Sequence, residues 1–184
     1  ELGSIKINKE ERTKMYKTIP RSSVIGFLIG VLPGAGATIA SFLAYGMERN
    51  IVNDEEKEKF GKGSVNGLSA PETANNAACS GSFVPMLTLG IPGSGTTAVM
   101  LGALLGFGVQ PGPRLYMTNP EIFWSIIMSM YIGMVILLIL NLPLIPYIAR
   151  ILAVPKNYLI PLILFFSITG IYVMSFNNFD IYLM

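Results

Sequence analysis

The 184-residue sequence contains no histidine, one cysteine and few charged residues. Without histidine the chain cannot form a Ser-His-Asp triad, a Cys-His dyad, a histidine general base or a histidine metal site. Because Cys79 stands alone, an intramolecular disulfide and a thiolate zinc site are also excluded. This cysteine is either a small packing residue or a reactive thiol.

Charge is scarce and unevenly placed. Only 13% of the residues are charged, against about 25% in a soluble domain. Residues 1–62 hold ten of the thirteen basic and eight of the eleven acidic side chains, whereas the other 122 residues hold six charges in total. Basic residues alternate with acids and lack interleaved aromatics, which argues against nucleic-acid binding. The composition therefore predicts an all-α, polytopic membrane protein.

The first apolar stretch is interrupted. Between Arg21 and Glu48 lie 26 uncharged residues, enough for a membrane span of about 20 residues. Pro33 removes a helical hydrogen bond near the middle, so we expect residues 22–46 to form a re-entrant hairpin or a broken span. Basic residues in the segments 1–21 and 47–70 predict that both flanks are cytoplasmic, which favours the hairpin.

Three further segments follow. Thr73–Pro113 is an uncharged run of 41 residues with several Pro-Gly breaks, so residues 71–113 are predicted to contain broken helices. Thr118–Glu121 is typical of a helix start, with Asn119 as cap and Pro120 at the first helical position. We expect transmembrane helices in residues 114–184, one ending near Leu140 at Asn141-Leu-Pro143 and one spanning about 157–176. The sequence has no start methionine and stops within an apolar stretch, which predicts a piece of a longer protein.

One short motif occurs twice. Leu32-Pro-Gly-Ala-Gly-Ala-Thr38 matches Ile91-Pro-Gly-Ser-Gly-Thr-Thr97 at an offset of 59 residues. Paired interruptions of this kind indicate a transporter binding site. Each proline leaves a carbonyl without its helical donor, those of Ile29 and Thr88, and each is a candidate Na⁺ ligand. The glycines allow backbone N–H groups to approach an anion at a helix N-terminus. The candidate substrate or ion ligands here are Pro33, Gly34, Gly36, Thr38, Pro92, Gly93, Ser94, Thr96 and Thr97.

A structural interpretation competes with this one. Gly26, Gly30 and Gly34 recur at four-residue spacing, as do Ser94, Ala98, Gly102 and Gly106. Such stripes allow membrane helices to pack closely without binding a ligand. We expect the outer members of each stripe to serve packing and the paired Pro-Gly-x-Gly cores to serve binding.

A polar cluster lies where the charged region ends. If the segment is helical, Glu72, Asn75 and Asn76 share one face. Polar groups at membrane depth indicate function, so all three are candidate site residues. The alternative for Glu72 is a cap at a helix N-terminus. A dinucleotide-binding interpretation of Gly34-x-Gly36 is rejected, because no alternating strands and helices follow.

Four motifs together resemble a known family. They are Gly30–Ala40, Ala70–Ala78, Thr88–Val99 and the Gly-Val-Gln-Pro-Gly-Pro segment at 108–113. In this order they are similar to the large membrane subunit of the tripartite tricarboxylate transporters, the TctA family. The resemblance is strongest from Gly26 to Pro113 and includes Phe176–Met184, and it places the chain in the second of two related halves. It implies half of an inverted-repeat secondary transporter with discontinuous helices, located in the bacterial inner membrane.

The resemblance also implies partners and a mechanism. A small membrane subunit and a periplasmic solute-binding protein would assist uptake of citrate or a related carboxylate. Transport would be symport with Na⁺ or H⁺, with no enzyme activity and no cofactor. The alternative function is a noncatalytic membrane scaffold or receptor component, in which the glycine motifs only pack helices.

Overall fold

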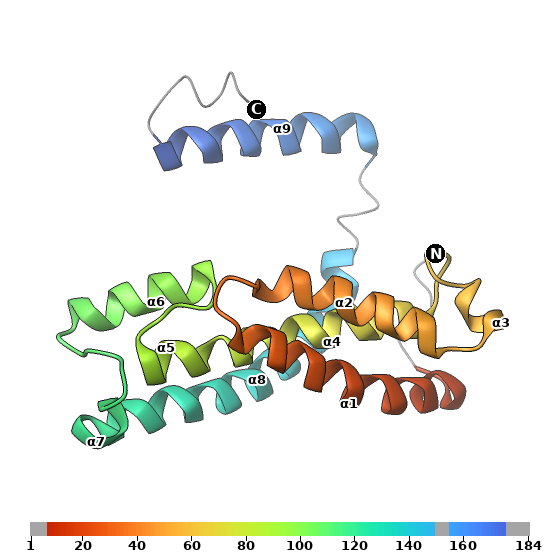
Figure 1. Cartoon of the computed structure of the whole chain (residues 1–184). Helices are drawn as coiled ribbons and strands as arrows, with labels where there is room; N and C mark the ends of the chain where they lie inside the picture. The colour runs from red at the N-terminus through yellow and green to blue at the C-terminus, as the bar shows by residue number, and fades with distance from the viewer. Residues whose placement is uncertain (1–6, 150–154, 176–184) are drawn as a thin grey trace. The chain divides into compact units, whose positions relative to one another are not determined.

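The computed structural model describes residues 7–149 and 155–175, which form helices and turns without a strand in those ranges (Figure 1). The chain divides into two compact units, Ser4–Met130 and Tyr131–Met184 together with the first three residues. The all-α class expected from the sequence is confirmed.

The first helix, α1, covers Lys9–Val31 and begins at a reciprocal cap. Asn8 Oδ1 accepts from the Glu11 N–H at 2.8 Å, and the Glu11 carboxylate accepts from the Asn8 N–H at 2.8 Å. These two bonds satisfy backbone donors that a helix start leaves free. The helix then runs through Pro20 and Arg21 without a break, so the expected boundary between residues 21 and 22 is not a boundary of secondary structure.

The chain folds back after α1. α2 begins only five residues later and covers Gly36–Ile51. Gly34 and Gly36 adopt φ of 85° and 69°, which only glycine adopts readily, so the turn depends on the Pro-Gly-Ala-Gly sequence. Thr18 and Arg21 of α1 both contact Glu48 of α2, which establishes an antiparallel hairpin. A hairpin is therefore present, and its re-entrant insertion in a membrane stays a prediction.

A seam of small residues joins the hairpin to α4, which covers Val65–Gly81 (Figure 1). At four-residue spacing α1 contributes Gly26 and Gly30. A Cβ added at Gly26 would lie 2.6 Å from the Cα of Ala74, and one added at Gly30 would lie 2.6 Å from the Cα of Ala78. The α2 and α4 sides are completed by buried alanines, namely Ala40, Ala44, Ala70, Ala74 and Ala78. The packing interpretation of Gly26 and Gly30 is thus confirmed, whereas Gly34, Gly102 and Gly106 have no such neighbour within 4 Å.

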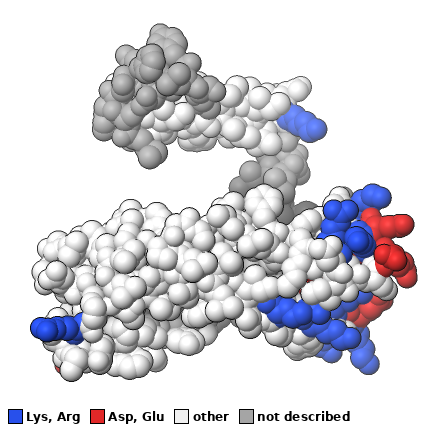
Figure 2. Space-filling model, viewed as in Figure 1, with Lys and Arg blue, Asp and Glu red and all other residues white. Residues whose placement is uncertain are grey.

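The charged end of this unit carries the short helix α3, Asp54–Lys57. Figure 2 shows charged side chains gathered at this end. The opposite end holds α5 (Phe83–Leu89), α6 (Gly95–Gly106), α7 (Leu115–Thr118) and the start of α8. Met86, Leu115 and Ile126 form part of a second buried cluster there.

The last two helices are long and apolar. α8 covers Pro120–Ala149 and starts at the proline, as the sequence predicts. It does not end at Asn141-Leu-Pro143, because Pro143 and Pro146 both lie within the helix. Proline forfeits only one helical hydrogen bond, and apolar helices of membrane proteins tolerate that loss. α9 covers Lys156–Ser175, close to the predicted span. Pro120–Ile148 and Lys156–Val173 are long and apolar enough to cross a membrane.

Candidate functional site

The two copies of the Pro-Gly motif meet in space. The Gly34 N–H donates to the Gly93 carbonyl at 3.4 Å, across a sequence separation of 59 residues. Each copy directly precedes a helix, since α2 starts at Gly36 and α6 starts at Gly95. The structure therefore brings Gly34 and Gly93 together, as a site shared by both motifs requires.

The second copy is held by a capping box. Ser94 Oγ accepts from the Thr97 N–H at 3.2 Å, and Thr97 Oγ1 accepts from the Ser94 N–H at 2.8 Å. Thr97 is buried and Thr96 is exposed. Ser94 and Thr97 thus fix the start of α6, and a ligand at Ser94 would share its hydroxyl with the cap.

Small side chains seat this copy against the end of α4. A Cβ at Gly93 would lie 2.9 Å from the Cβ of Ser82, so the backbone contact requires glycine. The Ser82 hydroxyl donates to the Cys79 carbonyl at 2.7 Å and is itself buried. Pro92, next to Gly93, is half-buried. The second motif therefore packs against the α4–α5 junction.

The first copy is more open. Pro33, Gly34 and Thr38 are exposed, and no atom lies within 4 Å of a Cβ built on Gly34 or Gly36. Pro33 removes the helical donor of the Ile29 carbonyl, and the Leu32 N–H donates to this oxygen instead, at 3.1 Å, where α1 ends. The Thr88 hydroxyl donates to the Val84 carbonyl of its own helix at 2.6 Å.

The polar cluster of α4 is exposed. Glu72, Asn75 and Asn76 are exposed, as expected for one helical face. The Asn76 amide donates to the Glu72 carbonyl at 2.8 Å. Glu72 is not a helix cap, because α4 starts at Val65 with Ser64 as its cap. Cys79 continues this exposed face and is therefore not a packing residue within this unit.

A buried polar cluster that sequence reasoning missed lies at the other end of the seam. Glu48 is fully buried, and its Oε1 accepts from Thr18 Oγ1 at 2.7 Å, Arg21 Nη2 at 2.7 Å and Asn66 Nδ2 at 3.0 Å. Ser22 is also fully buried, one helical turn from Thr18. The missed signal is a four-residue spacing that continues from small residues into buried polar ones, as in Ala40, Ala44 and Glu48.

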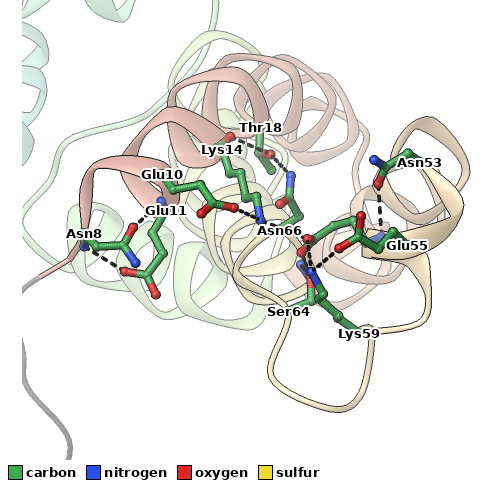
Figure 3. Close-up of polar contacts among 12 residues, drawn as sticks. Asn8, Glu10, Glu11, Lys14, Thr18, Asn53, Glu55, Lys59, Ser64 and Asn66 are labelled. Carbon is green, nitrogen blue, oxygen red and sulfur yellow. Dashed lines mark hydrogen bonds and ion pairs between the residues drawn. The ribbon is translucent and has the colours of Figure 1, made fainter.

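A second ion pair ties α1 to the segment after α2 (Figure 3). Lys14 Nζ contacts Glu56 at 3.0 Å, and Ser64 Oγ donates to the same carboxylate at 2.9 Å. Burial alone would raise the pKa of Glu56, but the hydrogen bonds from Lys14 and Ser64 outweigh it and lower this pKa. Hydrogen bonds to Glu10 and Glu56 raise the pKa of Lys14.

Metal ligation by acidic or sulfur side chains finds no support here. Within residues 7–149 and 155–175, no group of three or more Cys, Asp or Glu side chains is placed to hold a metal ion. A cation at the paired motifs would depend on backbone carbonyls and hydroxyls, which are oxygen ligands suited to hard cations.

Two helices long and apolar enough to cross a membrane, in a described chain that is otherwise helical, are the features expected of a helical membrane protein. Residues 1–184 match the model of the tripartite tricarboxylate transporter TctA family. The chain belongs to the TctA family, which is a transporter family with partner subunits.

Two relatives come from Agrobacterium vitis. One is an uncharacterized 52.8 kDa protein in the TAR-I ttuC' 3' region, 42% identical over 176 residues that cover 96% of this chain and 35% of the relative. The other is an uncharacterized protein in the TAR-II ttuC' 3' region, 45% identical over 157 residues that cover 85% of this chain and 64% of the relative. The chain thus spans about a third of the first relative's length. No solved structure matches it.

Proposed function

We propose that this chain is part of the membrane subunit of a tripartite transporter that takes up citrate-like tricarboxylates or related carboxylates by cation symport. A periplasmic binding protein would deliver the substrate, and a small membrane subunit would complete the complex in the bacterial inner membrane. Membership of the TctA family supports the transporter class. The residue-level proposal depends on the contact between Gly34 and Gly93.

That contact gives the proposed site its chemistry. Two helices begin at the paired breaks, and helix N-termini carry free N–H groups and a positive dipole end that favour a carboxylate. Gly34 and Gly36 leave their backbone open, since nothing occupies the space of a Cβ there. Backbone and hydroxyl oxygens, among them the Thr88 carbonyl, would serve Na⁺, while Asn75, Asn76 and Glu72 would complete the site in the full-length protein.

The scaffold alternative explains only part of the glycine pattern. Close packing accounts for Gly26 and Gly30, which touch Ala74 and Ala78 of α4. It does not account for Gly34 and Gly36, which adopt positive φ and touch no neighbouring element at the Cβ position. This difference favours a binding role for the first core, whereas Gly93 of the second core packs against Ser82.

The decisive experiment is uptake of labelled citrate by proteoliposomes that contain the full-length protein and its partner subunits, with and without a Na⁺ gradient. Gradient-driven uptake is expected. Repeating the uptake measurement with an H⁺ gradient in place of the Na⁺ gradient would show which of the two ions drives transport. No uptake of any carboxylate under either gradient would leave the scaffold as the function.

A matched pair of variants tests Ser94. Ser94→Asp and Ser94→Asn both retain an N-cap, because aspartate and asparagine cap helices as well as serine does. Only aspartate adds a negative charge, which would repel a carboxylate. We expect Ser94→Asp to abolish uptake while Ser94→Asn retains most of it, at equal protein levels. Equal uptake by the two variants would remove Ser94 from the substrate site.

Asn76 is tested separately. Asn76→Ala should lower uptake with the protein level unchanged, whereas Asn50→Ala, at an exposed position near the charged end of α2, should have no effect. Unaltered uptake by Asn76→Ala would restrict the site to the paired Pro-Gly motifs.

A further inference from the structure

A pocket of about 380 Å³ lies in the loop that connects α6 to α8, lined by residues 110–115 and Thr118. It contains most of the Gly-Val-Gln-Pro-Gly-Pro segment, to which the proposed function assigns no role. Its volume falls within the range of about 300–1,000 Å³ typical of small-molecule sites. We refer to it as the Arg114 pocket.

The pocket is attached to the second Pro-Gly motif by backbone contacts. The Gly112 N–H donates to the Leu87 carbonyl at 3.2 Å, and the Leu115 side chain is buried in the core beside Met86. The Pro111 carbonyl lies 2.8 Å from where a Cβ of Gly90 would be. Gly90 immediately precedes Ile91-Pro92-Gly93, so the pocket loop contacts the backbone directly before the second motif.

Arg114 provides the charge of this pocket. Its carbonyl accepts from the Met117 and Thr118 N–H groups, each at 2.9 Å, which fixes its backbone. No ion pair or hydrogen bond engages its guanidinium, or the exposed Gln110 amide, within the part of the chain that the structure describes. Both groups are therefore left as donors for a ligand.

The location of the pocket suits a ligand arriving from water. The loop lies between the apolar helix α6 and the candidate span Pro120–Ile148, where the chain leaves the apolar region. Within this unit α7 lies at the end opposite α3 and its charged side chains (Figures 1 and 2). With the charged end cytoplasmic, as basic residues predict, the pocket faces outward.

We propose that the Arg114 pocket is the first binding site for the transported carboxylate before it reaches the paired motifs. This inference rests on the proposed function and adds an entry site to it. An arginine fork binds one carboxylate through two parallel N–H···O bonds. The Gln110 amide supplies a further donor, and a second carboxylate of the same ligand would point toward Gly90 and the second motif.

Transport kinetics give the first test. In proteoliposomes of the complete transporter, Arg114→Gln is expected to raise the KM for citrate about tenfold or more with little change in maximal rate, because a charge-assisted contact is lost. The KM of Arg114→Lys should lie between those of the unaltered protein and Arg114→Gln, since lysine keeps the positive charge but lacks the two-pronged guanidinium. Arg49→Gln, at an exposed arginine near the charged end, is the matched control with unchanged KM. An unchanged KM for Arg114→Gln would overturn the inference.

Ligand protection gives a readout that does not depend on transport. In a Cys79→Ser background, a cysteine introduced at Pro113 should be protected from a maleimide by citrate and not by glycerol. Arg114→Gln should abolish this protection, and a cysteine introduced at Asn50 should label equally with and without citrate. Protection without uptake would retain the pocket and reject the symport proposal, whereas uptake without protection would retain symport and reject the pocket. A cysteine at Pro113 that never labels would show that another part of the protein fills the pocket, which also overturns it.

Discussion

The backbone N–H of Gly34 donates to the carbonyl of Gly93, which joins two copies of one motif from distant parts of the chain. The contact forms because each copy ends a helix and exposes its peptide groups. Ser82 supports the second copy, while the first follows the hairpin of α1 and α2. The turn of the hairpin and the second break are thus in direct backbone contact.

Close packing at the seam predicts a strong effect of one methyl group. Gly30→Ala would place a Cβ 2.6 Å from the Ala78 Cα, so α1 and α4 must separate. Overpacking of this kind costs about 1–3 kcal/mol. Thermal unfolding of the purified full-length protein in detergent should show a clear fall in melting temperature. Gly102→Ala is the control, since nothing lies within 4 Å of that position. Equal melting temperatures for the two variants would contradict the seam.

The buried ion pair predicts an asymmetric response to substitution. Arg21→Met leaves Glu48 buried beside Thr18 and Asn66 without its counter-ion. Loss of one member of a buried pair costs about 3–5 kcal/mol, and the 39% exposure of the Arg21 side chain reduces this to about 2 kcal/mol. Arg49→Met, at an exposed arginine, should change stability by less than about 0.5 kcal/mol.

A double-mutant cycle isolates this pair. Arg21→Met combined with Glu48→Met should be less destabilised than the sum of the single variants, because no uncompensated charge then remains. Unfolding of all four forms gives the coupling energy. Strict additivity would show that the Arg21–Glu48 contact does not contribute to stability.

The lowered pKa of Glu56 predicts acid sensitivity. A carboxyl group with a folded-state pKa below its ordinary value of 4.5 stabilises the fold above that value. This contribution is lost as the pH falls from 4.5 through the folded-state pKa, when the Glu56 carboxylate is protonated and its ion pair with Lys14 is lost. Melting temperature should therefore decline below about pH 4.5, and Glu56→Gln should flatten that decline. Glu58→Gln, at an exposed position, should leave the profile unchanged.

The antiparallel hairpin predicts the sidedness of two loops. Lys14 contacts Glu56, so the start of α1 and the segment after α2 lie at one end of the unit. In a Cys79→Ser background, cysteines at Lys9 and Lys59 should label from the same face of the membrane with an impermeant maleimide. Positive charge predicts that this face is cytoplasmic. Labelling from opposite faces would show a full crossing in place of a hairpin.

Several features followed directly from the sequence. Apolar composition predicted a helical protein, Pro33 predicted the interruption between α1 and α2, and Pro120 predicted the start of α8. These are local effects, since proline lacks an N–H and glycine alone adopts positive φ readily. The repeat at Leu32 and Ile91 likewise predicts both breaks from the sequence alone.

Other features were decided only by tertiary structure. Pro143 lies inside α8 although it was expected to end a helix, because a long apolar helix continues past one missing hydrogen bond. Glu48 has the sequence context of a surface charge, yet it is fully buried because Arg21, Thr18 and Asn66 converge on it from two other helices.

The lack of histidine and the scarcity of charge predicted a membrane protein and excluded histidine-dependent catalysis. They did not determine which glycines serve packing and which serve binding. Gly30 and Gly34 belong to one sequence stripe, but only Gly30 faces the backbone of α4, whereas Gly34 turns the chain and reaches Gly93. Spacing along a helix fixes the face on which a residue lies, and only the packing of a second helix decides what that face contacts.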